Sequence, residues 1–227
     1  MEWLVSNALG IGEIAWINMV LSGDNAVVIA LASRSLPARQ RALGIFFGAG
    51  AAILLRIAFA FIITRIMQVD YLKIAGGLLL LWIAVKLAKG EAESERNVAA
   101  HQRLWRAVLT IAVADATMSL DNVIAIAAVA GGEHWLFIFG LALSIPLIVV
   151  GSTLIMKLMD HYPVIVWGGA ALLGWVAGEM IATDPAMAPQ VDLAPFNLGE
   201  YAFAATGALL VVGLAYVLKQ RKEESEI

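Results

Sequence analysis

Seven apolar segments account for most of this 227-residue chain. A helix needs roughly 20 apolar residues to cross the hydrocarbon core of a bilayer, and each segment has about that length. Charged residues make up only 15% of the chain, against roughly 25% in a soluble domain. The sequence therefore predicts an all-α integral membrane protein with seven transmembrane helices. The predicted spans are residues 11–32, 43–64, 71–88, 105–130, 135–158, 163–181 and 202–218.

The basic residues lie mainly on one side of the predicted bundle. With the N-terminus outside, only Arg65 and Lys73 fall on the outer side and Arg56 falls within a span. Basic loops stay in the cytoplasm, so we expect the N-terminus outside and the C-terminus inside. The start of the chain has no basic region and no small-residue cleavage site, so we expect no cleaved signal peptide. The remaining basic residues, all on the cytoplasmic side, are Arg34, Arg39, Arg41, Lys86, Lys89, Arg96, Arg103, Arg106, Lys157, Lys219, Arg221 and Lys222.

Two segments of the chain resemble each other. LSGDNAVVIA (21–30) aligns with MSLDNVIAIA (118–127) without a gap, and a weaker likeness links 71–87 with 162–180, where a Tyr is followed by a Gly pair and a Trp. The chain therefore consists of two three-helix repeats and a seventh helix. Because three is odd, the second repeat enters the membrane from the opposite side, as in the inverted repeats of many transporters. The aligned polar pairs are Ser22 with Ser119, Asp24 with Asp121, and Asn25 with Asn122.

These repeats divide a single transmembrane transporter domain, residues 1–227. The polar segment between the repeats mixes both signs of charge, and the segment before the seventh helix is acidic and rich in Pro. The predicted parts are repeat one (11–88), a cytoplasmic linker (89–104), repeat two (105–181), a periplasmic loop (182–201), the seventh helix (202–218) and a cytoplasmic tail (219–227).

The paired aspartates lie deep within their spans. Asp24 is ten residues before Arg34, and Asp121 is ten residues before Gly131. At about 1.5 Å per residue each is about 15 Å from the end of its helix, which is half of a roughly 30 Å hydrocarbon core. The two motifs should therefore meet at the membrane midplane.

Carboxylates at that depth need a partner, because a charged side chain at the bilayer centre costs at least ~2.5 to 3.5 kcal/mol. Oxygen atoms of carboxylates, amides and hydroxyls are the ligands of hard divalent cations such as Mg²⁺, Ca²⁺ and Mn²⁺. The chain has no cysteine, which excludes thiolate ligands. Asn18 aligns with Asp115, so the two halves are not equivalent. The predicted metal ligands are Asp24, Asp121, Asn25, Asn122, Asp115, Ser22 and Ser119.

Further polar and sulfur-containing side chains are candidates for the ion pathway, each beside a plainer structural alternative. Arg56 lies in the middle of a span and could replace the ion as a counter-charge, or pair with a backbone carbonyl or an acid. Met19 and Met118 flank the motifs and would favour a transition metal as thioether ligands, or simply pack. Glu179 could gate the path or extend to the membrane surface, and a role for Glu13 stays open.

The motifs SGDNAVVIALASRSLP (22–37) and DATMSLDNVIAI (115–126) resemble those of the TerC family of integral membrane proteins, which is related to LysE-type exporters. The resemblance covers essentially the whole chain. It implies a cation exporter of the bacterial cytoplasmic membrane, with Mn²⁺ as the associated substrate and an ion path formed by Asp24, Asp115 and Asp121.

The expected function is export of a divalent metal cation, with metal binding displacing protons from the carboxylates and one repeat rocking against the other. We expect the ion and the lipid bilayer as partners, no resident cofactor, no nucleic acid and no enzymatic activity, and leave a homo-oligomer open. Two alternatives remain: export of another solute such as an amino acid, and a membrane scaffold or stress-complex subunit without transport.

Overall fold

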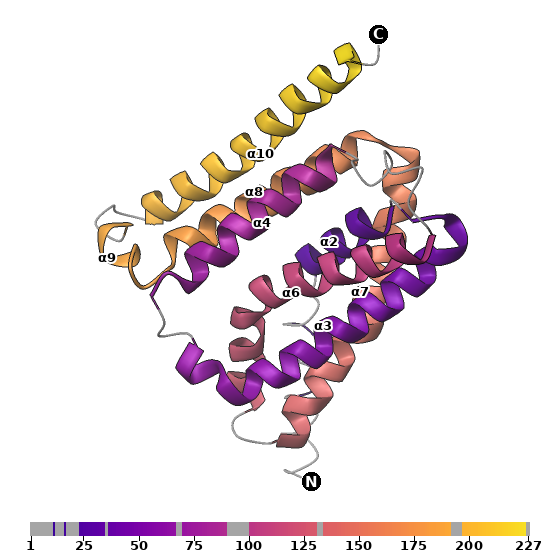
Figure 1. Ribbon diagram of the computed structural model, residues 1–227. Coiled ribbons are helices and arrows are strands. Elements are labelled where there is room, and N and C mark those ends of the chain that lie inside the picture. Colours follow the sequence, from indigo (N-terminus) through magenta and orange to yellow (C-terminus); the bar gives the residue numbers. More distant parts are fainter. Residues whose placement is uncertain are drawn as a thin grey trace.

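The chain folds into helices throughout the part that the structure describes. The computed structural model describes residues 11, 16, 23–34, 36–66, 70–89, 100–130, 134–191 and 197–225. Among these residues there are seven helices of twelve residues or more and one short helix. In chain order they are α2 (Gly23–Arg34), α3 (Ala38–Ile66), α4 (Leu72–Ala88), α6 (Ala100–Ala130), α7 (His134–His161), α8 (Val164–Ala182), α9 (Ala188–Val191) and α10 (Leu198–Ser225), drawn in Figure 1. The predicted all-α class is confirmed.

The helices follow the apolar segments and differ from them at the ends. Helix α6 begins at Ala100, so the last residues of the predicted linker 89–104 are helical. Helix α10 runs from Leu198 to Ser225 and extends past both ends of the predicted span 202–218. Hydropathy marks only the part of a helix that lipid would cover, whereas the backbone hydrogen bonds of a helix continue into polar turns.

Two of the described helices are long and apolar enough to cross a membrane, judged by length and composition. They are Val164–Ala182 in α8 and Leu198–Arg221 in α10. The other spans and the inverted topology stay predictions.

The long helices form two groups that lie side by side (Figure 1). In the three-helix group, α8 packs along α4 on one side and α10 on the other. In the four-helix group, α3 packs mainly on α6, and α2 mainly on α7. The contacts between the groups are fewer and run from α4 to α6 and from α8 to α2 and α7.

Glycines bring the backbones of the three-helix group into direct contact. A Cβ added to Gly174 of α8 would lie 2.5 Å from the carbonyl oxygen of Gly207 in α10. A Cβ added to Gly77 of α4 would lie 2.7 Å from the carbonyl oxygen of Ala177 in α8. Helices in lipid associate through such small residues, since close approach of two backbones gives extensive van der Waals contact.

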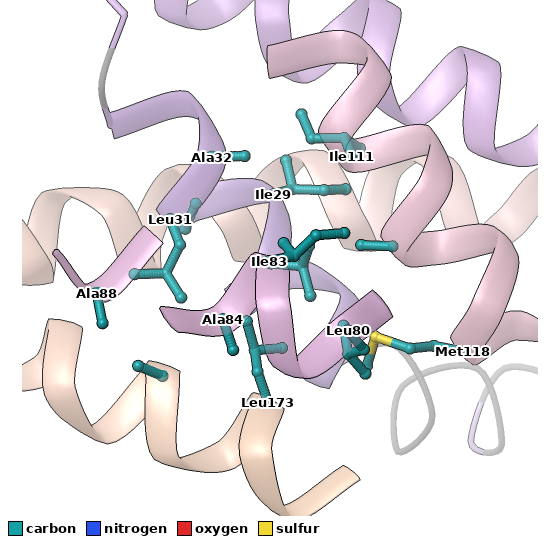
Figure 2. Close-up of a cluster of buried hydrophobic side chains, with 14 of the residues drawn as sticks. Ile29, Leu31, Ala32, Leu80, Ile83, Ala84, Ala88, Ile111, Met118 and Leu173 are labelled. Atoms are coloured by element: carbon teal, nitrogen blue, oxygen red, sulfur yellow. The ribbon is translucent and has the colours of Figure 1, made fainter. Parts of the chain in front are cut away.

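The two groups meet at an apolar core. Figure 2 shows Ile29 and Leu31 of α2 near Ile83 and Ala84 of α4, with Leu173 of α8 below them. Ile29 and Leu173 are fully buried. The interface between the groups is therefore lined by aliphatic side chains.

A buried carboxylate lies at one end of the three-helix group, where α8 ends and α4 begins. Asp184, two residues beyond α8, has no exposed surface and accepts hydrogen bonds from the backbone N–H groups of Tyr71 (3.0 Å), Lys73 (3.0 Å) and Ile74 (3.2 Å) at the start of α4. The N–H of Ala186 donates a fourth bond, at 2.9 Å. Burial raises the pKa of Asp184, but the four donors together outweigh it and leave the pKa below its ordinary value of 3.8. Asp184 thus caps a helix from more than 100 residues away.

An ion pair lies at one end of the four-helix group. Nη1 of Arg41, near the start of α3, donates to Asp160 near the end of α7 at 2.6 Å. Its Nε and Nη2 donate to the carbonyl oxygens of Leu36 (3.2 Å) and Arg34 (3.3 Å) at the end of α2. Nε of Arg34 lies 3.9 Å from Asp160. One guanidinium therefore joins the ends of α2, α3 and α7.

Candidate ion site

The first motif lies at the start of the described part of α2. Asp24 is half-buried, and its Oδ1 accepts a hydrogen bond from the backbone N–H of Asn25 at 2.7 Å. Asn25 is 1% exposed. Residues 28–33 on its C-terminal side are all buried. Asp24 and Asn25 therefore lie just before an enclosed stretch of α2.

The second half of the candidate site lies on α6. Asp115 is 2% exposed and Met118, one turn further on, is 6% exposed. Thr117 bonds back to the carbonyl oxygen of Ala114 at 2.7 Å. Asp115 is therefore a carboxylate enclosed by the helix bundle.

Helices α2 and α6 pack against each other and run in opposite directions. A Cβ on Gly44 of α3 would lie 3.7 Å from Oγ of Ser33, near the end of α2, and 3.6 Å from Cδ1 of Leu104, near the start of α6. At about 1.5 Å per residue, Asp24 is about 14 Å from this common end and Asp115 about 16 Å. The two carboxylates therefore lie at similar depth.

Helix α6 is continuous from Ala100 to Ala130 and includes the second motif, residues 119–122. Unwinding at the motif, which would free backbone carbonyls for an ion, is not seen there. By the same rise per residue, Asp121 lies about 25 Å from the common end, roughly 9 Å further along α6 than Asp115. Along the helix axis, Asp115 is nearer in depth to Asp24 than Asp121 is.

Several predicted site residues lie outside the part of the chain whose side chains the structure describes. They are Ser22, Asn18, Met19, Ser119, Asp121, Asn122 and Arg56. Glu13 lies outside it as well. Their predicted roles stay predictions.

Glu179 is exposed and lies three residues before the end of α8, in the three-helix group. Among the described side chains, no three His, Cys, Asp or Glu residues come close enough together to hold a metal ion. The described part of the candidate site therefore consists of two carboxylates, Asp24 and Asp115, with the amide of Asn25.

This arrangement restricts the chemistry that the site can perform. A charge at the bilayer centre costs at least ~2.5 to 3.5 kcal/mol unless it is protonated or paired. Oxygen ligands suit hard cations. The described residues of the site thus supply oxygen atoms of the kind that hard cations bind.

Sequence analysis missed two polar contacts, Asp184 at the start of α4 and the pair of Arg41 with Asp160. An acid just after a predicted span was a signal for Asp184, but its donors are distant in sequence and follow no periodic pattern. For Arg41, the sequence indicated only that Arg41 and Asp160 would lie on the same side of the membrane.

Comparison with known proteins gives a family match over nearly the whole chain. The model of the "Integral membrane protein TerC family" matches residues 4–223. An uncharacterised membrane protein of Bacillus subtilis, YjbE, is 39% identical over 183 residues, which cover 81% of this chain and 82% of that protein.

More distant relatives include two further proteins, YceF and YegH. YceF of Bacillus subtilis is 26% identical over 75% of this chain and 69% of its own length. YegH of Escherichia coli, a UPF0053 protein, is 28% identical over 73% of this chain but only 35% of its own length. No solved structure matches the chain. The family match over residues 4–223, together with the all-helical fold, shows that this chain belongs to the TerC family of integral membrane proteins.

Proposed function

We propose that this protein exports a divalent metal cation, with Mn²⁺ as the first candidate, from the bacterial cytoplasm. The observation that carries the proposal is the burial of Asp115 and Asn25 on two helices that pack together in an integral membrane protein. An ionisable residue inside a membrane protein marks a substrate or ion path by default. Oxygen ligands favour Mg²⁺, Ca²⁺ and Mn²⁺, and a thioether from Met118 would favour Mn²⁺ among them.

In this mechanism, ion binding and proton binding compete for the same carboxylates. Asp24 and Asp115 are deprotonated when they hold the ion, so loading releases protons. Protonation from the outer side then weakens the site and releases the ion outward. Moving one elementary charge against 100 mV requires ~2.3 kcal/mol, and proton influx would supply it.

The proposed topology is seven spans, with two inverted repeats and the N-terminus outside. The pairing of helices supports it. If α2, α3 and α4 correspond to α6, α7 and α8, then the pair α3–α6 corresponds to α7–α2, and α4–α6 corresponds to α8–α2; all four pairs are in contact. The pair α4–α8 corresponds to itself, as expected for helices on a pseudo-twofold axis.

The test is ion flux into proteoliposomes that contain the wild type, Asp24→Asn, Asp115→Asn or Asp70→Asn. Asp70 is exposed and lies outside the helices, so its variant is the matched control. We expect Mn²⁺ uptake to depend on a pH gradient and to fall at least about 100-fold in the two site variants, since each removes a charged ligand. It should stay unchanged in Asp70→Asn.

Absence of flux for Mn²⁺, Ca²⁺ and Mg²⁺ in folded wild type would contradict the proposal and favour a scaffold without transport. Flux of an amino acid, without flux of any of the three cations, would show that the protein exports another solute. Equal loss of flux in all three variants would point to damaged folding and not to an ion site.

A further inference from the structure

The helix groups observed in the fold do not coincide with the sequence repeats. Repeat one supplies α2, α3 and α4, and repeat two supplies α6, α7 and α8. The packing joins α4 with α8 and α10, and it joins α2 and α3 with α6 and α7. Each group therefore contains helices of both repeats, which bears on what can move during transport.

The three-helix group is held by close contacts between helix backbones. The glycine contacts between α8 and α10 and between α4 and α8 are made against backbone carbonyls. Backbone atoms in a helix have no alternative rotamer, so these helices cannot slide without losing the contact. Three backbone N–H donors at the start of α4, those of Tyr71, Lys73 and Ile74, bond to Asp184 and add a polar connection between the end of α8 and α4.

The four-helix group is held together differently. Arg41 ties α3 to Asp160 of α7 and to the terminal carbonyls of α2. The α2–α7 and α3–α6 packing joins the remaining helices. Both helices of the candidate ion site, α2 and α6, belong to this group.

The contact between the groups involves side chains. A Cβ on Gly76 of α4 would meet Thr117 of α6, and a Cβ on Gly169 of α8 would meet Val27 and Leu31 of α2. The adjoining core is aliphatic (Figure 2). Aliphatic side chains can change rotamer and exchange partners without breaking a hydrogen bond, so this surface permits sliding or tilting.

We propose that the four-helix group moves as one unit against the three-helix group during transport, and carries the ion site with it. This inference rests on the proposed export function. It replaces the rocking of one repeat against the other, in which the interface would separate α2 from α6 and thus Asp24 from Asp115. In the group movement those two acids stay together, and only their exposure to either side changes.

The structure offers two matched positions for engineered disulfides in a chain that has no cysteine. A Cβ on Gly76 would lie 3.4 Å from Cβ of Thr117, across the two groups. A Cβ on Gly151 of α7 would lie 3.3 Å from Cβ of Ala26 in α2, inside the four-helix group. Both separations are close to the roughly 3.5 to 4.5 Å of a disulfide, and both pairs join repeat one to repeat two.

The experiment measures Mn²⁺ flux of G76C/T117C and A26C/G151C in proteoliposomes, before and after oxidation and again after reduction. Disulfide formation is followed by loss of maleimide labelling. We expect oxidation to reduce flux at least about tenfold in G76C/T117C, reduction to restore it, and oxidised A26C/G151C to keep its flux.

Inhibition of both oxidised pairs would overturn the group movement and favour repeats that rock. Inhibition of neither would also overturn it, as would an A26C/G151C pair that oxidises while G76C/T117C does not. Because each variant is compared with its own reduced form, these outcomes are separate from failure of the proposed function, which would appear as absence of flux in the wild type.

Discussion

At the scale of single residues, Asp184 is the carboxylate whose surroundings the structure defines most fully. It has no exposed surface and accepts four backbone N–H bonds at 2.9 to 3.2 Å. Two of these donors, Lys73 and Ile74, belong to the first turn of α4, where N–H groups have no partner within the helix. A negative charge at that position also interacts favourably with the helix dipole. Asp184 therefore acts as a structural acid and stands apart from the proposed ion ligands.

The Asp184→Asn variant should be less stable than the wild type at neutral pH by about 2 to 3 kcal/mol, since bonds to a charged acceptor are the stronger ones. The folded pKa of Asp184 is lowered from 3.8, so its ionised form contributes stability above that pH. This contribution is lost as the pH falls below 3.8 and through the folded value. Thermal unfolding in detergent between neutral pH and about pH 3 measures the effect.

The difference between Asp184→Asn and the wild type should therefore shrink on acidification. Asp70→Asn, an exposed acid at the same corner, is the control and should change stability by less than about 0.5 kcal/mol. A difference between Asp184→Asn and the wild type that is constant with pH would show that the charge of Asp184 contributes nothing.

At the scale of elements, glycine decides how closely α8 and α10 approach. A Cβ on Gly207 would collide with the carbonyl oxygen of Gly174, whereas a Cβ on Gly213, on the same helix, would meet nothing within 4 Å. The same substitution can therefore be compared at a crowded position, Gly207, and at an open one, Gly213.

Gly207→Ala should lower stability by about 1 to 3 kcal/mol, because the helices must move apart to admit the methyl group. Gly213→Ala should be neutral or stabilising by up to about 1 kcal/mol through helix propensity. Unfolding midpoints of both variants in one detergent give the comparison. Equal effects of the two substitutions would be inconsistent with direct backbone contact between α8 and α10.

The elements themselves could largely be predicted from the sequence, because the length of an apolar segment follows from the thickness of the bilayer. The ends of α6 and α10 could not, since polar turns carry no hydropathy signal. The division into two groups was also missed. An internal repeat says which helices correspond, but close approach in lipid depends on small residues such as Gly174 and Gly178.

The residues of the candidate site could be proposed in part from the sequence. An acid within an apolar run is conspicuous, and the structure does enclose Asp115 and half-bury Asp24. The alignment of repeats pairs Asp24 with Asp121, but pairing in an alignment does not set the register of two packed helices. Counted from the common contact of Ser33 and Leu104 with the position of Gly44, Asp115 is nearer to Asp24 along the helix axes than Asp121 is.

At the scale of the whole molecule, orientation decides which end of each helix group faces the cytoplasm. Arg41 and Asp160 lie at the predicted cytoplasmic end of the four-helix group, and Asp184 lies at the predicted outer end of the three-helix group. If the outer side is the acidic side, protons would enter the proposed site from the side on which the ion would leave it. The gradients of protons and metal ions set the direction of an antiport, so orientation decides only which end of the proposed site faces the cytoplasm.

Single cysteines in this cysteine-free chain can establish that orientation. Pro189 is exposed in α9, and Arg221 is exposed near the end of α10. In intact spheroplasts, a membrane-impermeant maleimide should label Pro189→Cys and should label Arg221→Cys only after permeabilisation, because basic segments stay in the cytoplasm. Labelling with the reverse pattern would place the C-terminus outside and contradict the proposed topology.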